Sequence, residues 1–336
     1  MIITRTPYRI SFFGGGTDYP SWYRNNGGQV LSTTIDKYVY ITCRYLPPFF
    51  DHRVRLAYSE VEECYSADEL QHPSASAVLR FLNINDGVEI HYDGDLPSRS
   101  GIGSSSAFTV GLLKTLHAYK GEMISAEKLA QEATYIEQQI IGETVGSQDQ
   151  VSAAFGGLNR IEFPKIGPPI VTPVIMKADR RSELEGNLML FFTGIVRTAA
   201  VVASTYGDGP EQRKSLRNTT RLVDEALELL GSEKDLVGFG ELLDQGWNEK
   251  RKLSNNVSTQ QLDRFYSRGC EAGAVGGKIA GAGGGGMLLL YVPAEKQNDV
   301  RVALSELLLI PIKFETAGCQ VIFFSESQDR LSGGAQ

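Results

Sequence analysis

A run of small residues stands directly before an apolar helical pattern at residues 94–113, GDLPSRSGIGSSSAFTVGLL. Glycine lets the backbone turn sharply and pass close to a ligand, and the free N–H groups of a helix's first turn attract an anion. Serine caps such a helix and adds hydroxyl groups. Gly101 to Ser106 therefore predict a phosphate cradle, with a serine-capped helix that binds no ligand as an equal alternative. The loop lacks the ending of a Walker A motif and the third glycine of GxGxxG.

A second segment, GGKIAGAGGGGMLLL at 276–290, has six glycines among residues 277–286. Holding so many glycines in one conformation costs conformational entropy. The density indicates a backbone packed against another backbone or against a ligand, because a strong strand pattern follows with no linker residues. The alternative is a flexible hinge.

A third segment, TPYRISFFGGGTDYP at 6–20, joins a strand that carries Arg9 to the glycines 14–16 and then to Thr17 and Asp18. A strand end that presents hydroxyl and carboxylate groups suits the recognition of a polyol. The alternative is a β-turn that Asp18 caps.

Composition limits the classes of partner. The chain has 336 residues, of which 42% are hydrophobic and 22% charged, as in soluble globular proteins. Its net charge of -7, without a long basic run, disfavours nucleic acid and anionic membranes. The four cysteines are far apart with no CxxC, which predicts buried reduced thiols. No signal-peptide pattern or apolar run of about 20 residues is present, so we expect a cytoplasmic protein.

The elements that must position these segments are predicted from periodicity. Strands are expected where β-branched and alternating apolar residues occur, at 2–13, 29–46, 87–92, 156–163, 187–193, 286–292, 310–315 and 319–324. Helices are expected where apolar residues recur every three or four positions, at 74–82, 104–120, 126–141, 210–230, 233–245, 258–272 and 294–308.

The length of the chain predicts two domains. Residues 164–186 hold four prolines and several charges, which indicates the approach to a boundary near residue 180. We expect an N-terminal domain over 1–180, a C-terminal domain over 181–327 and a loose tail at 328–336. In the second domain, a strand, helix, strand, strand, helix, strand order is ferredoxin-like.

In chain order, the three glycine-bearing segments resemble the three motifs of the GHMP kinases, a family that includes galactokinase, homoserine kinase and mevalonate kinase. The first motif matches Pro7 to Ile10, and the third matches Lys278 with the glycines that follow it. The second, Pro-x3-Gly-Leu-Gly-Ser-Ser-Ala, matches Pro97, Gly101, Ile102, Gly103, Ser104 and Ser105, with Ser106 in place of alanine. The resemblance implies an α+β, two-domain GHMP kinase fold. Its N-terminal domain is like domain 2 of ribosomal protein S5, and its C-terminal domain is ferredoxin-like.

The same resemblance implies roles in phosphoryl transfer from ATP. The ATP phosphates are expected across the second motif, at Pro97, Gly101, Gly103, Ser104, Ser105 and Ser106. Within 135–157, Glu137 and Asp149 match a magnesium-binding glutamate and a catalytic aspartate, with one more residue between them than in mevalonate kinases. We expect Ser105 and Glu137 to hold Mg²⁺. Asp149 would orient the acceptor hydroxyl and accept its proton, and Arg9 would stabilise the transferring phosphoryl group or hold Asp149.

The GGGTDYP stretch resembles sugar kinases that act on anomeric hydroxyls. It implies phosphorylation of the C1 hydroxyl of a sugar phosphate, D-glycero-D-manno-heptose 7-phosphate, to the 1,7-bisphosphate used in nucleotide-activated heptose synthesis. The residues expected to contact this substrate are Gly15, Gly16, Thr17, Asp18, Gly283 and Gly284. A substrate phosphate needs a second anion pocket, for which Arg197 is favoured over Arg24 and Lys37; a solvated side chain is the alternative for each.

Other functions of the same fold stay open. They are a galactokinase-like, fucokinase-like or mevalonate-type kinase, an ATP-dependent decarboxylase, and a sugar sensor without activity. Gly15 and Gly16 replace the Glu-His of galactokinases, which disfavours galactose, and the presence of Asp149 disfavours a sensor. Lys278 is interpreted equally as a surface lysine or a phosphate ligand. The expected partner is a small molecule, with a homodimer as an option for the assembly.

Overall fold

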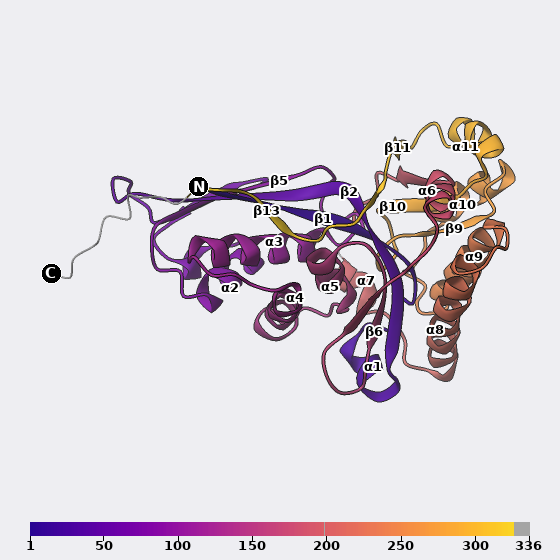
Figure 1. Cartoon of the computed structure of the whole chain (residues 1–336), viewed down its shortest axis with the longest axis horizontal. Coiled ribbons are helices and arrows are strands. Elements are labelled where there is room, and N and C mark those ends of the chain that lie inside the picture. Colours follow the sequence, from indigo (N-terminus) through magenta and orange to yellow (C-terminus); the bar gives the residue numbers. More distant parts are fainter. Residues whose placement is uncertain (198, 326–336) are drawn as a thin grey trace.

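Two β-sheets and the helices packed on them make up the described part of the chain, residues 1–197 and 199–325 of the computed structural model (Figure 1). Over these residues the larger sheet has nine strands, β1 (Ile2–Phe13), β2 (Gly28–Tyr45), β3 (Val54–Ala57), β4 (Val61–Cys64), β5 (Val88–Gly94), β6 (Leu158–Phe163), β7 (Ile170–Pro173), β12 (Phe314–Glu315) and β13 (Gln320–Phe324). Their order is β13-β1-β2-β5-β3-β4, while β6 and β12 pair with other parts of β2, and β7 pairs with β6. The long strand β2 is therefore the strand around which this sheet is built.

The first half of the chain forms the helices α1 (Pro20–Asn26), α2 (Pro73–Phe81), α3 (Ser104–Tyr119), α4 (Ala126–Tyr135) and α5 (Gln148–Phe155), with a 3-10 turn η1 (Ala67–Glu69) and a π-helical turn η2 (Ile136–Ile140). Figure 1 shows α2 to α5 together beneath the sheet, and α3 packs directly on β1 and β2. Most side chains of α3 are buried, so the helix that follows the glycine–serine loop is rigidly held.

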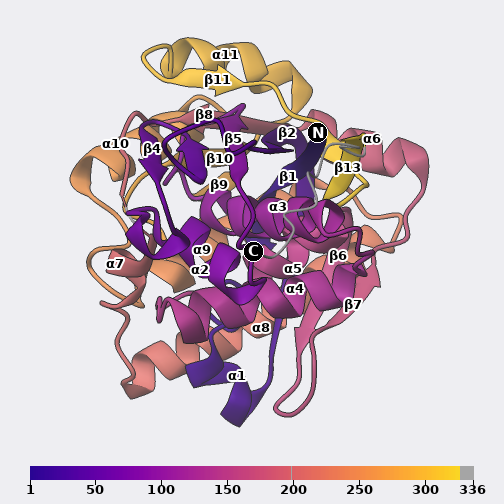
Figure 2. The same ribbon diagram turned by 90° about the vertical axis from the view of Figure 1, so that its left-hand side faces the viewer.

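The C-terminal sheet consists of β8 (Leu188–Phe192), β9 (Gly276–Ile279), β10 (Met287–Tyr291) and β11 (Leu308–Ile310). Around it lie α6 (Ala178–Gly186), α7 (Ala199–Ala203), α8 (Pro210–Leu230), α9 (Val237–Arg251), α10 (Gln260–Glu271), η3 (Ala294–Lys296) and α11 (Gln297–Ala303). All its pairings are antiparallel, in the order β11-β8-β10-β9. In Figure 2, β11 and α11 lie at one end of the molecule and α1 at the other. Along the chain the strands and helices follow the ferredoxin-like order, so the predicted α+β fold class is confirmed.

The strands that give this order differ from those predicted. β9 was not predicted, because its sequence GGKI sits inside the glycine-rich segment and glycine weakens a strand pattern. The predicted strand at 319–324 is β13, which pairs with β1 in the other sheet. The predicted strand at 310–315 is also wrong as one unit, because only its first residue belongs to β11, while β12 pairs with β2.

The two sheets do not divide the chain at a single position. Residue 180, near the predicted boundary, falls within α6. The chain completes the C-terminal sheet at β11 and then returns to the larger sheet through β12 and β13. Strands after residue 181 therefore belong to both sheets, and the predicted tail at 328–336 lies outside the described residues.

Two hydrophobic clusters lie on opposite faces of the C-terminal sheet. On β10, Met287, Leu289 and Tyr291 join the cluster that continues into the N-terminal half. Leu288 and Leu290 join a separate cluster with Trp247. Because successive strand residues point to opposite faces, the unbroken apolar run of β10 is explained by burial on both sides. No helix within 1–197 and 199–325 is long and apolar enough to cross a bilayer.

Candidate active site

The three glycine-bearing segments meet around a cavity of about 710 Å³. Of the predicted site residues, those that line it are Arg9, Gly15, Gly16, Asp18, Pro97, Gly101, Gly103, Ser104, Ser105, Ser106, Glu137, Asp149, Arg197 and Gly283. Thr17 and Gly284 do not line it. Residues predicted from segments more than 100 positions apart are thus brought to one site.

The glycine–serine loop has a backbone that other residues do not readily adopt. Gly101 has a φ of 82° and Gly103, at the N-cap of α3, a φ of 75°, so both occupy the left-handed region that glycine tolerates. Ser104 Oγ accepts from the backbone N–H of Arg99 at 3.2 Å and so fixes the loop. The first N–H groups of α3 have no partner inside the helix, which leaves a place where an anion can bind.

The third glycine segment packs backbone to backbone against this loop. A Cβ atom on Gly101 would lie 2.6 Å from the carbonyl oxygen of Ala280, and one on Gly286 would lie 2.2 Å from that of Ser100. The backbone N–H of Met287 donates to the same Ser100 oxygen at 3.1 Å. This close approach explains the glycine density, and the interpretation as a flexible hinge is wrong.

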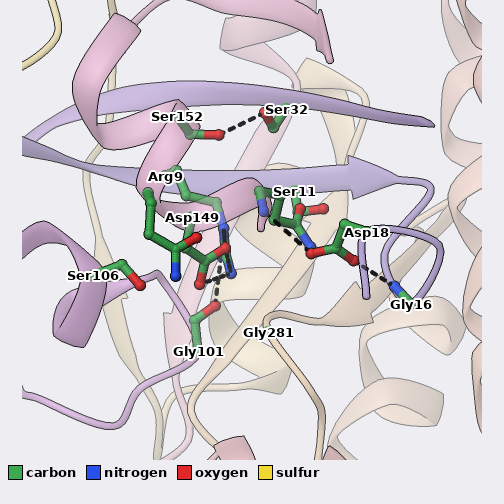
Figure 3. Close-up of polar contacts among 12 residues, drawn as sticks. Arg9, Ser11, Gly16, Asp18, Ser32, Gly101, Ser106, Asp149, Ser152 and Gly281 are labelled. Atoms are coloured by element: carbon green, nitrogen blue, oxygen red, sulfur yellow. Dashed lines mark hydrogen bonds and ion pairs between the residues drawn. The ribbon is translucent and has the colours of Figure 1, made fainter. Parts of the chain in front are cut away.

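Arg9 and Asp149 form the central ion pair of the cavity (Figure 3). Arg9 Nε donates to Asp149 Oδ1 at 2.7 Å, and Nη2 donates to Oδ2 at 2.9 Å. Arg9 Nη1 also donates to the carbonyl oxygen of Gly101 at 2.9 Å, within the glycine–serine loop. The Arg9 side chain is 5% exposed and that of Asp149 25%. The carboxylate is therefore held from one side and stays accessible to a ligand from the other.

Asp18 lies beside this pair at the end of β1. Its two carboxylate oxygens accept from the backbone N–H groups of Gly16 at 3.0 Å and Gln148 at 3.3 Å. Burial, together with the nearby Asp149 carboxylate, raises the pKa of Asp18 to about 6. Gly146 approaches so closely that a Cβ atom there would lie 1.9 Å from Asp18 Oδ2. No motif in the sequence marks this glycine as part of the site.

Two of the residues predicted to contact the substrate, Thr17 and Gly284, are packed against the protein's own backbone. Thr17 is fully buried, and its hydroxyl lies 2.7 Å from the carbonyl oxygen of Gly14 and 3.0 Å from that of Gln29, either of which can accept its single proton. It thereby anchors the turn that presents Asp18. A Cβ atom on Gly284 would lie 3.1 Å from the carbonyl oxygen of Asn256, which shows that this glycine serves backbone packing.

Glu137 is buried in the π-helical turn η2, next to the first turn of α3. Ser106 Oγ donates to Glu137 Oε2 at 2.8 Å, and Gln150 Nε2 donates to the same oxygen. Among the residues that the structure describes, buried Glu137 Oε1 has no hydrogen-bond partner within bonding geometry, and burial raises the pKa of this carboxyl to about 7. Ser106 thus contacts Glu137 directly, while the side chain of Ser105, the serine predicted to bind Mg²⁺, is exposed.

Glu137 lies in a π-helical turn, η2, and lines the cavity together with Asp149. A π-helical turn holds one residue more than an α-helical turn and often occurs at functional sites.

Basic residues differ in their access to the cavity. Arg197 lines it and is exposed, with its Cδ near the backbone of Gly284. Arg24 and Lys37 are not among the lining residues. Lys278 is buried and lines the cavity together with Lys250. The interpretation of Lys278 as a surface lysine is therefore wrong. Lys250 was missed, because a lysine in an amphipathic helix gives no signal of its tertiary neighbours.

An aromatic group lines the cavity near α2. Tyr58 and His72 make an edge-to-face contact with ring centroids 5.1 Å apart. The Phe108 ring lies 4.6 Å from His72 and 5.5 Å from Tyr92. All four residues line the cavity. No pattern of spacing in the sequence indicates this group, because its members come from a hairpin, two helices and a separate strand.

An α+β fold of two domains, with a glycine–serine helix start beside an arginine-held aspartate, defines a class of small-molecule kinases. Residues 70–157 match the GHMP kinases N terminal domain, and residues 222–308 match the GHMP kinases C terminal domain. The chain belongs to the GHMP kinase family.

Similar proteins agree with this assignment. The chain is 30% identical over 317 residues to a D-glycero-alpha-D-manno-heptose 7-phosphate kinase of Campylobacter jejuni, covering 91% of this chain and 94% of that protein. A solved structure described as a "Putative Sugar Kinase from Campylobacter jejuni" is 27% identical with a TM-score of 0.74, covering 95% of this chain and 97% of that one. A third, described as a "D-glycero-D-manno-heptose 1-phosphate kinase from Bacteriodes thetaiotaomicron", shares the fold at 24% identity with a TM-score of 0.77, covering 97% and 100%.

Proposed function

We propose that this chain transfers the γ-phosphoryl group of ATP to the C1 hydroxyl of a sugar phosphate, D-glycero-D-manno-heptose 7-phosphate. The position of the Arg9–Asp149 pair between the glycine–serine loop and Asp18 carries the proposal. It places a carboxylate where a phosphate donor and a polyol acceptor would meet. The 30% identity to a heptose 7-phosphate kinase supports the choice of acceptor.

The transfer forms one bond and breaks one. The C1 oxygen attacks the γ-phosphorus, the bond to the bridging oxygen of ATP breaks, and ADP leaves. Asp149 orients the hydroxyl and takes its proton. This proton is removed more readily than that of an ordinary alcohol, because an anomeric hydroxyl is more acidic. Since two N–H groups of Arg9 occupy one side of the carboxylate, its remaining lone pairs are free for the acceptor. Phosphoryl transfer depends mainly on such positioning and on charge stabilisation.

The phosphates of ATP would lie against Gly101 to Ser106 at the start of α3, where N–H groups and the helix dipole favour negative charge. The aromatic group of Tyr58, His72, Tyr92 and Phe108 offers flat apolar surface for a nucleotide base. Both belong to the same cavity, so one nucleotide can contact both.

The residues around Glu137 fit a magnesium ion. Its buried Oε1 has no hydrogen-bond partner within residues 1–197 and 199–325, and carboxylate and hydroxyl oxygens are the ligands that this hard cation prefers. Glu137 with Ser106 would hold the ion, and Ser105 offers an exposed hydroxyl one residue earlier. When bound, Mg²⁺ would neutralise negative charge on the phosphates during the transfer.

The acceptor would lie between Asp149 and Arg197. Asp18 would accept hydrogen bonds from hydroxyl groups of the sugar, and Gly15 and Gly16, which have no side chains, allow the sugar to approach closely. Arg197, exposed at the cavity, would bind the phosphate that the substrate already carries, because a planar guanidinium matches phosphate oxygens.

A coupled assay of ADP release tests this function. Heptose 7-phosphate, mannose, fucose and galactose are compared as acceptors, and ³¹P NMR locates the new phosphate. We expect turnover with heptose 7-phosphate and a product phosphorylated on C1. If only sugars without a phosphate are turned over, the assignment of heptose 7-phosphate as the acceptor is wrong and the chain is another sugar kinase. Release of CO₂ without a stable phosphorylated product would indicate a decarboxylase.

A further inference from the structure

Two buried lysines line the cavity from the C-terminal half of the chain, Lys250 on α9 and Lys278 on β9. Each is 7% exposed. Within residues 1–197 and 199–325, neither forms an ion pair with a carboxylate. A buried ammonium group without a counter-charge is costly, so this pair requires an explanation.

The hydrogen bonds of the two ammonium groups leave donors unused. Lys278 Nζ donates to the carbonyl oxygens of Ser11 at 2.9 Å and Phe12 at 2.8 Å. Lys250 Nζ donates to those of Ile279 at 3.4 Å and Gly281. A lysine ammonium carries three N–H donors. Each lysine therefore keeps one donor after binding the backbone.

The charged groups around the two lysines indicate that an anion is missing. Arg9 is neutralised by Asp149, and Asp18 is the other carboxylate whose charge reaches both lysines. Burial and the neighbouring cations lower the pKa of Lys278 to about 7 and hold that of Lys250 well below its ordinary value. These shifts favour neutral amines while no anion is bound, and an anionic ligand would favour the protonated form of both lysines, which carries the third N–H donor.

The location of the pair indicates which anion. Lys250 binds Gly281, and the Gly281 backbone touches Gly101 in the glycine–serine loop. Lys278 binds carbonyl groups of β1 that lie two and three residues beyond Arg9. Both ammonium groups are therefore tied to the backbone that surrounds the Arg9–Asp149 pair.

We propose that Lys250 and Lys278 together bind a phosphate group in the cavity, through one remaining N–H donor on each. The group is either the γ-phosphate of the nucleotide or the phosphate ester of the sugar. Compact ammonium groups suit this task, since they act as point charges that keep several donors. Only binding of the sugar's phosphate ester rests on the proposed function, because it requires the proposed acceptor.

The test measures binding rather than turnover. Equilibrium dissociation constants are determined with Mg²⁺ for AMP-PNP and ADP, and for heptose 7-phosphate and the unphosphorylated heptose. The variants are Lys250→Met and Lys278→Met, with Lys252→Met as the matched control. Lys252 directly follows α9 and pairs with Glu249 on the surface. Lys250→Gln is made as well, because its amide retains a donor for Gly281 while removing the charge.

If the pair binds the γ-phosphate, the preference for AMP-PNP over ADP falls about tenfold or more in the cavity variants, as expected for hydrogen bonds to a charged group. If it binds the sugar phosphate, the preference for heptose 7-phosphate over heptose falls instead. Lys252→Met leaves both preferences unchanged. The proposal is overturned if both ligand preferences stay at the wild-type value in Lys278→Met and in a folded Lys250 variant, either Lys250→Met or Lys250→Gln. The nucleotide measurement requires no sugar, so a failure of the proposed acceptor does not affect it.

Discussion

Gly281 touches the backbone of Gly101: a Cβ atom on Gly281 would lie 2.6 Å from the Gly101 Cα atom. The residues are 180 positions apart, yet each lies in a glycine-bearing segment of the active site. Gly281 also has a φ of 65°, where a larger residue is strained. The shape of the glycine–serine loop therefore depends on a residue in the C-terminal half.

Replacing Gly281 by alanine is expected to displace the glycine–serine loop. We expect the affinity for ADP to fall about tenfold and the free energy of unfolding to fall by about 1–3 kcal/mol, because the new methyl group meets backbone atoms that cannot move aside. Calorimetric titration and urea denaturation measure the two effects. Gly186→Ala is the control, since a Cβ atom there meets nothing within 4 Å. Nucleotide affinity equal to that of the wild type would show that the contact does not shape the loop.

Asp149→Asn tests the central carboxylate. An amide neither accepts the acceptor's proton nor pairs with both N–H donors of Arg9, so kcat is expected to fall by about 10²–10⁴, with ADP affinity within a few-fold. Steady-state kinetics and a binding titration give the two values. The control is Asp263→Asn, which breaks an ion pair with Arg251 on the surface. Turnover close to normal in the Asp149 variant would remove this residue from the mechanism.

Glu137→Gln tests the proposed metal ligand. The amide can keep its hydrogen bond with Ser106 but loses the charge that binds a cation. We expect the Mg²⁺ concentration that gives half-maximal activity to rise about tenfold or more, since a charged ligand contributes at least 1.4 kcal/mol to such a site. Glu143→Gln is the matched control, because Glu143 is a second carboxylate that lines the cavity. A larger effect from Glu143 than from Glu137 would reassign the ligand.

Asp18 predicts a dependence of stability on pH. Its pKa is 3.8 in the unfolded chain and about 6 in the fold. Between these values the folded protein holds a proton that the unfolded chain has lost. The free energy of unfolding is therefore highest below pH 3.8 and falls by about 2–3 kcal/mol as the pH rises through 6.

Urea denaturation of the ligand-free protein between pH 4 and 7 measures this contribution. The difference between wild type and Asp18→Asn is expected to change with pH in this window, while Asp263→Asn follows the wild type. An Asp18→Asn curve parallel to that of the wild type would contradict the raised pKa.

Local sequence patterns determined much of the framework. The alternating strands β1 and β2, and the helix α3 behind its glycine–serine loop, begin and end within a residue or two of their predicted positions. The residues of the Arg9–Asp149 pair were also predicted, through the resemblance of their motifs. Such features depend on neighbours close in the chain, so that periodicity and capping residues are enough to indicate them.

Only the tertiary structure decided which distant groups meet. A strand pattern does not specify its partner, so β13 was assigned to the wrong sheet, and glycine concealed β9. Three successive serines look alike in sequence, but the rotation of α3 brings Ser106 to Glu137. Lys250 gave no signal at all, because its burial depends on how α9 packs against β9. The glycine segments indicated close approach, and the fold determined that they approach each other.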